Sequence, residues 1–110
     1  MFLARVKGHV VATAKDPAIK GQRLLIVEPL KVDYDDTQAA ANQRGEGGGR
    51  LDVTGRAIVA MDHIGAGEGQ LVLIVQGSSA RMAEGLNKVP VDAVIIGIVD
   101  EAVVMGQRVN

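Results

Sequence analysis

A serine pair in the second half of the sequence comes nearest to a chemical site. Ser78 and Ser79 lie within Gly77–Arg81, between an apolar run and a short stretch of helical character. A nucleophilic serine at such a turn needs a second glycine after it, a general base and an orienting acid. The second glycine is absent, and the only histidines are His9, expected in mid-strand, and His63, at a strand end. We therefore expect no catalytic site.

Metal and carboxylate chemistry have little support. His9 and His63 have neither helical spacing nor other expected ligands, so solvated or interface histidines are the default interpretation. Asp92 and Asp100 flank an apolar strand at opposite ends. At about 3.3 Å per residue they would lie too far apart to act as a carboxylate pair. We expect no metal, and we interpret the aspartates as polar strand ends or as interface hydrogen-bonding groups.

Two glycine-rich segments superficially resemble nucleotide-binding loops. Gly65–Gln70 lacks the third glycine of the dinucleotide fingerprint, and a strand follows it where a helix should begin. Gly45–Gly49 lacks the Lys-Ser or Lys-Thr pair of a phosphate-binding loop. The first is interpreted as a tight turn and the second as part of a linker, so no cofactor is expected.

The composition is that of a small, nearly neutral domain. The 110 residues fit one domain, and 47% of them are hydrophobic although only Phe2 and Tyr34 are aromatic. A formal net charge of -1 provides no positive field for nucleic acid or anionic membrane, so we expect neither as a partner. The lack of cysteine excludes disulfides and thiolate chemistry and is compatible with a cytoplasmic location. With no signal-like or membrane-spanning apolar run, we expect a soluble, unprocessed protein.

Apolar patterning predicts a succession of short strands separated by turn residues. The predicted strands cover residues 2–15, 23–30, 56–62, 71–75 and 91–100. Little helix and many glycine-rich turns accompany them. The sequence therefore predicts an all-β fold, a small five-stranded OB-like β-barrel.

Three further segments complete this single domain. Residues 33–52 are expected to form a long glycine-rich loop insertion, mobile and poorly ordered at its tip. Ser78 or Ser79 can cap one short helix over residues 80–84. Residues 101–110 are expected to form a C-terminal tail.

Two predicted strands are apolar on both faces. In a barrel of this size the outer face of each strand meets water, so the outer apolar face of 71–75 or of 91–99 needs cover from a partner subunit. Burying a Val or Ile contributes roughly 1.5 to 3 kcal/mol, so a handful of such residues would hold an oligomer together.

The order of these segments resembles a known family. The matching segments are Val6–Thr13, Lys20–Val27, Ile64–Gly69, Val72–Val75, Gly77–Arg81 and Pro90–Asp100. In this combination the sequence resembles the EutN/CcmL family, the vertex proteins of carboxysomes and metabolosomes. The resemblance implies a non-enzymatic shell protein, a cyclic homopentamer at the fivefold corners of an icosahedral bacterial microcompartment in the cytoplasm. It also implies hexameric and trimeric shell proteins as partners.

On that resemblance, two groups of residues are expected at subunit or shell contacts. The close-packing positions are Gly65, Gly67, Gly77 and Ala80. The polar anchors are Ser78, Ser79, Arg81, Asp92 and Asp100. A cation at the start of a helix is poorly placed for the helix dipole, which favours a guanidinium that reaches a neighbouring subunit.

Two other functions stay open on the residues alone. An OB-fold module that binds single-stranded nucleic acid would use aromatic platforms in a basic groove, and the sequence offers neither. A small enzyme or ligand-binding barrel would need a concave site with convergent polar groups. No such group of residues can be located from the sequence.

Overall fold

The computed structural model describes residues 1–13, 15–33, 50–82 and 91–110. Its strands are β1 (Phe2–Val10), β2 (Arg23–Asp33), β3 (Arg50–Val53), β4 (Ile58–Asp62), β5 (Leu71–Gln76), β6 (Ala93–Ile98), β7 (Val103–Val104) and β8 (Gln107–Arg108). Short 3-10 helices, η1 (Pro17–Ile19) and η2 (Gly77–Met82), complete the described elements. The described structure is nearly all β, as the sequence predicts.

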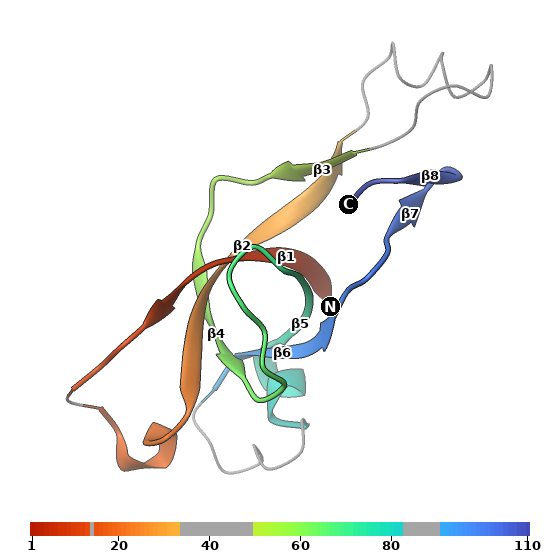
Figure 1. Cartoon of the computed structure of the whole chain (residues 1–110). Coiled ribbons are helices and arrows are strands. Elements are labelled where there is room, and N and C mark those ends of the chain that lie inside the picture. Colours follow the sequence, from red (N-terminus) through yellow and green to blue (C-terminus); the bar gives the residue numbers. More distant parts are fainter. Residues whose placement is uncertain (14, 34–49, 83–90) are drawn as a thin grey trace.

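Five strands form a closed barrel. They are hydrogen-bonded in the order β1, β5, β6, β4, β2, and β2 pairs with β1 again, so the sheet closes on itself (Figure 1). All neighbours in the barrel are antiparallel except β4 and β6, which run parallel. Closure leaves these strands without a free edge. The predicted five-stranded barrel is confirmed.

The ends of the predicted strands differ from the observed ones. The first strand ends at Val10 rather than at residue 15, and Asp16 then caps η1 by accepting a 2.8 Å hydrogen bond from the Ala18 amide. The second strand continues past Leu30 to Asp33 because its last residues pair with β3. Propensity alone could not supply that partner, since it lies across the loop insertion.

The barrel interior is filled by side chains that alternate along the strands. Most are small or β-branched, so the core closes without a buried aromatic ring. Its fully buried members are Ala4, Val6, Leu25, Val27, Ala60, Ala66, Val72, Ile74, Ala93 and Ile95. Phe2, Ile58 and Ile98 pack against this core and are partly exposed.

A second apolar cluster lies on the outside of the barrel wall. Met61 of β4 and Val94 of β6 are buried there beneath Ala80 of η2. The expected short helix is thus a 3-10 helix in its described part, and residues 83–90 lie outside the described residues. No helix in the described segments is long and apolar enough to cross a membrane. Cover for part of the outer wall therefore comes from the chain itself.

An arm extends from the barrel where the glycine-rich insertion begins and ends. Residues Leu30–Asp33 of β2 pair with β3 in antiparallel register, from Leu30 opposite Val53 to Asp33 opposite Arg50. Residues 33 and 50–52, which the sequence assigns to the loop, are therefore strand residues. The rest of the predicted loop, residues 34–49, lies outside the described residues.

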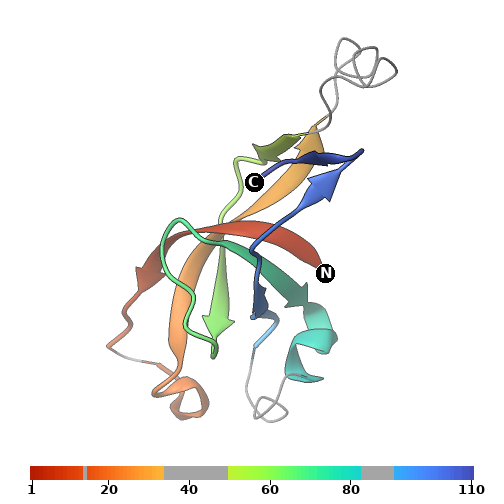
Figure 2. The same cartoon turned by 45° about the vertical axis from the view of Figure 1, so that its right-hand side comes forward.

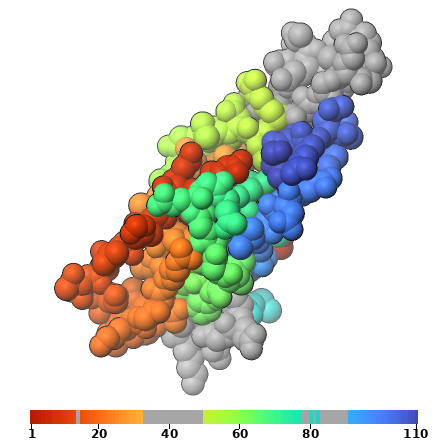
Figure 3. Space-filling view, in the orientation of Figure 1, coloured from red at the N-terminus to blue at the C-terminus, as the bar shows by residue number. Residues whose placement is uncertain are grey.

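The C-terminal tail is a two-stranded hairpin. β7 and β8 pair through Val103 opposite Arg108, and the turn between them has positive φ at Met105 and Gly106. Figures 1 and 2 both place this hairpin beside the β2–β3 arm, and the space-filling view shows the same neighbourhood (Figure 3). The sequence predicts a tail here but no pairing within it.

Candidate functional site

The candidate contact residues occupy two ends of the barrel wall. Gly77 begins η2 directly after β5, and its amide donates a 2.7 Å hydrogen bond to the carbonyl of Asp92, just before β6. Asp100 follows β6 at the opposite end. The fold therefore brings Gly77, Ala80 and Asp92 together and separates them from Asp100.

Gly65 and Gly77 are set by backbone conformation. Their φ angles are 88° and 72°, in the left-handed region that glycine enters without a Cβ clash. A Cβ built at either position would meet no heavy atom within 4 Å in this chain. Gly67 has no such φ, and its amide donates a 2.7 Å hydrogen bond to Oε1 of Gln70. Within one chain, these glycines shape turns rather than allow close packing.

In η2 the structure describes the side chain of Ala80 but not those of its polar neighbours. Ala80 is fully buried, and its methyl group packs in the cluster with Met61 and Val94. Ser78, Ser79 and Arg81 belong to η2, but their side chains lie outside the described residues. The expected contact between Arg81 and a neighbouring subunit therefore stays a prediction.

The two aspartates act here mainly through their backbones. Both are exposed. The carbonyl of Asp100 accepts hydrogen bonds from Arg108 at 3.2 Å and from Asn110 at 3.0 Å, which ties the tail to the end of β6. With Asp92 at the other end of the strand, the geometry excludes a carboxylate pair formed by these two residues.

The two histidines are exposed, and each contacts a different partner. Nδ1 of His9 is 3.8 Å from a carboxylate oxygen of Glu68, and His63 hydrogen-bonds Gln22. Among the described residues, no three acidic or histidine side chains gather closely enough to hold a metal ion.

Sequence reasoning missed a buried ionic network at the end of β4. The Asp62 carboxylate is fully buried and accepts hydrogen bonds from the amides of Ile64 at 3.1 Å and Ala66 at 3.0 Å. Nη1 of Arg23 lies 2.5 Å from the same carboxylate and also donates to the Ala66 carbonyl. An aspartate three residues before Gly65 was the available signal, but the arginine comes from a distant strand.

We use the name wall patch for three exposed apolar residues of β4, β6 and the loop after β4: Val59, Ile64 and Ile96. Their exposed fractions are 48%, 47% and 38%. Asp62 lies opposite Ile95 in the parallel β4–β6 pairing, so Ile96 is level with the start of the loop that contains Ile64. Ile96 is also the extra residue of a bulge, because Leu73 pairs with Gly97 and Ile74 with Ile95. All three side chains lie outside the apolar cluster that contains Ala80 of η2.

A family model and two relatives of known name match this chain over most of its length. The family model described as ethanolamine utilisation protein EutN/carboxysome matches residues 1–100. The bacterial microcompartment shell vertex protein EutN of Escherichia coli is 42% identical over 107 residues, which are 97% of this chain and 95% of that protein. The carboxysome shell vertex protein CcmL of a Synechocystis species is 38% identical over 100 residues, 91% of this chain and 83% of that protein.

A solved structure agrees with these sequence matches. The GrpN pentameric microcompartment shell protein from Rhodospirillum rubrum superposes with a TM-score of 0.70 at 32% identity, covering 94% of this chain and 99% of that one. Sequence, fold and coverage all agree. The chain therefore belongs to the EutN/CcmL family.

Proposed function

We propose that this chain is a structural subunit that forms pentameric vertices in a bacterial microcompartment shell. The observation that carries the proposal is the family match over residues 1–100, together with relatives that are named shell vertex proteins. A pentameric relative of the same fold supports the subunit number. The protein acts by geometry rather than by catalysis and resides in a shell within the cytoplasm.

Fivefold symmetry is the physical basis of this function. A sheet tiled only by hexagonal units stays flat or rolls up, so a closed icosahedral shell needs fivefold units at its corners. A cyclic head-to-tail interface repeated around a ring provides such a unit from one kind of subunit. The neighbours of the ring would be hexameric and trimeric shell proteins.

The wall patch supports a subunit contact on the outer barrel wall. Val59, Ile64 and Ile96 are exposed in one chain, yet none is required by the barrel core. Full burial of each such side chain would contribute roughly 1.5 to 3 kcal/mol, and the gain is smaller here because each is already partly covered. Repeated at every interface of a ring, this burial favours assembly without changing the fold of the subunit.

The polar anchors and turn glycines complete the proposed contacts. The polar group is Ser78, Ser79, Arg81, Asp92 and Asp100. Gly65, Gly67 and Gly77 would let a neighbour's backbone approach, and Ala80 would support that surface from within the chain. A guanidinium suits a carboxylate or a row of carbonyls on the neighbouring subunit.

Native mass spectrometry of the purified chain tests the ring, and co-expression with hexameric shell proteins tests the vertex. We expect a complex of five times the chain mass and closed, faceted shells in electron micrographs. Without this chain, the same hexamers should form open sheets or tubes. A stable monomer or dimer across ordinary salt concentrations would contradict the ring, and closed shells formed in its absence would contradict the vertex role.

A further inference from the structure

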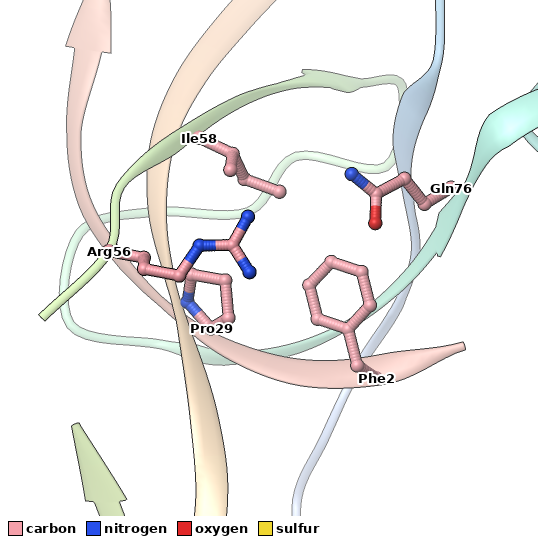
Figure 4. Close-up of a pocket in the computed structure, with 5 residues that line it drawn as sticks. All are labelled: Phe2, Pro29, Arg56, Ile58 and Gln76. Carbon is pink, nitrogen blue, oxygen red and sulfur yellow. The ribbon is translucent and has the colours of Figure 1, made fainter. Parts of the chain in front are cut away.

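One end of the barrel contains a small cavity of about 110 Å³. Side chains from separate segments line it: Phe2, Pro29, Arg56, Ile58 and Gln76. Figure 4 shows these side chains pointing toward one another across the barrel end. Ile58 directly precedes Val59 of the wall patch, but its side chain faces the cavity, and the proposed vertex role gives the cavity no task.

The floor of the cavity is apolar and held in place by the barrel. Phe2 and Ile58 pack on the buried core while remaining partly exposed on their outer sides. Pro29 is on β2 opposite Ala4 and has no amide hydrogen to offer. A rigid apolar floor of this kind is typical of sites that are formed before a ligand arrives.

The rim is polar and carries a positive charge. In Figure 4 the guanidinium of Arg56 and the carboxamide of Gln76 face the same space above Phe2. The loop before β4 is fixed by Thr54, whose hydroxyl donates to the Pro29 carbonyl at 2.7 Å and accepts from the Arg56 amide at 3.4 Å. Among the described residues, no carboxylate forms a salt bridge with the Arg56 guanidinium. The cation is available to a ligand that enters the cavity.

We propose that this cavity binds a short-chain carboxylate. The planar guanidinium matches a carboxylate with two parallel hydrogen bonds, and the Gln76 amide can donate another. The aliphatic part of the ligand would lie on Phe2 and Ile58. At about 30 Å³ per water molecule, the cavity corresponds to three or four waters, which suits an acid of about two to four carbons. Inorganic phosphate could pair with the guanidinium, but it has no aliphatic part to pack on Phe2 and Ile58.

Methyl NMR on the purified, selectively labelled protein tests this directly. Sodium acetate, propionate and butyrate would be titrated at constant ionic strength, with propionamide and inorganic phosphate as comparison probes. We expect the Ile58 methyl signal to shift while the Ile64 methyl signal, in the wall patch, stays in place. Affinity should rise up to about fourfold per added methylene until the cavity is full. Propionamide should bind at least about tenfold more weakly than propionate.

Matched variants separate the guanidinium from general charge. Arg56→Gln should weaken propionate binding by about tenfold to a hundredfold, and Arg56→Lys should recover only part of the loss. Lys31→Gln removes one positive charge from an exposed position of β2 and should leave binding unchanged. Unaltered binding in Arg56→Gln, or equal affinity for propionamide, would overturn the proposal. So would a weakened ring in Arg56→Gln, because the guanidinium would then hold a neighbouring subunit. The titration does not depend on a pentamer or a shell.

Discussion

At the scale of single residues, Asp62 has the clearest physical role. It is the only buried charged or polar residue among those described. Its carboxylate accepts hydrogen bonds from two backbone amides of the loop after β4. The Arg23 side chain, itself half exposed, supplies the opposite charge from β2. A buried carboxylate is tolerated only when its charge and lone pairs are satisfied, and here that requirement fixes the Ile64–Ala66 turn.

Replacing Asp62 should therefore destabilise the barrel. Asp62→Ala leaves the amides of Ile64 and Ala66 without their acceptor, at roughly 1 to 3 kcal/mol for each group that stays buried. We expect a loss of about 2 to 4 kcal/mol in the free energy of unfolding, measured by urea denaturation at fixed protein concentration. Glu101→Ala, at an exposed carboxylate, should change it by no more than about 0.5 kcal/mol. Similar values for the two variants would contradict a structural role for the network.

Alanine substitutions at two turn glycines can distinguish the cost of backbone strain from the loss of subunit packing. Gly77 has a φ of 72° with open space around a built Cβ, so Gly77→Ala should cost about 1 to 2 kcal/mol through conformation alone. Gly67→Ala should cost the barrel little, since its Cβ would only reach ordinary contact with Gln70 at 3.8 Å. Thermal unfolding and ring dissociation should be measured for both. A ring that is weakened by Gly67→Ala while the barrel stays stable would place Gly67 at a subunit contact, whereas no effect on the ring would remove it from the interface.

At the scale of elements, the C-terminal hairpin is attached to the barrel at the end of β6. The last described hydrogen bond from this end of the chain to the barrel runs from the Val99 amide to the Leu71 carbonyl at 2.8 Å. Beyond it, the Ala102 amide bonds to Asn110 within the tail, and Arg108 and Asn110 donate to the carbonyl of Asp100 at the end of β6. An isolated two-stranded hairpin is marginal in water, so its neighbours contribute to holding it.

Truncation after Asp100 should accordingly leave the barrel folded. Val99 keeps its bond to Leu71, and the hydrogen bonds that Arg108 and Asn110 make to Asp100 lie at the junction of the deleted hairpin. We expect the circular-dichroism spectrum of the barrel to persist and the free energy of unfolding to fall by no more than about 1 kcal/mol. A larger loss, or an insoluble product, would show that the hairpin packs onto the barrel or the arm more strongly than these bonds indicate.

At the scale of the whole molecule, assembly depends on the surface that the barrel leaves uncovered. η2 hides Met61 and Val94, but the wall patch beside them remains exposed. Outward apolar residues that lie outside the core add less to the stability of one subunit than core residues do. They can therefore be changed without unfolding the barrel, which makes the proposed interface testable.

Ile96→Ser should weaken the ring and spare the barrel. The side chain is 38% exposed in a single chain, and its burial by a neighbour would be lost at every interface around the ring, at roughly 1 kcal/mol each. Ring dissociation measured by dilution should shift toward subunits by about fivefold or more per interface. Val11→Ser changes a residue that is 84% exposed and outside the patch, and it should leave dissociation unchanged. Equal behaviour of the two variants would move the interface to another surface.

The sequence by itself determined the barrel and the family. Alternating and continuous apolar runs report which residues avoid water, and that information is local, so the strands at Arg23–Asp33 and Leu71–Gln76 were predicted within a few residues. The glycine turn at Gly65–Gln70 could be predicted for the same reason, because turn preference is also local. Only the tertiary structure decided which distant groups meet, because such contacts depend on closure of the whole sheet. Closure joined Arg23 to Asp62, set β3 against the end of β2, and placed the guanidinium of Arg56 over an apolar floor.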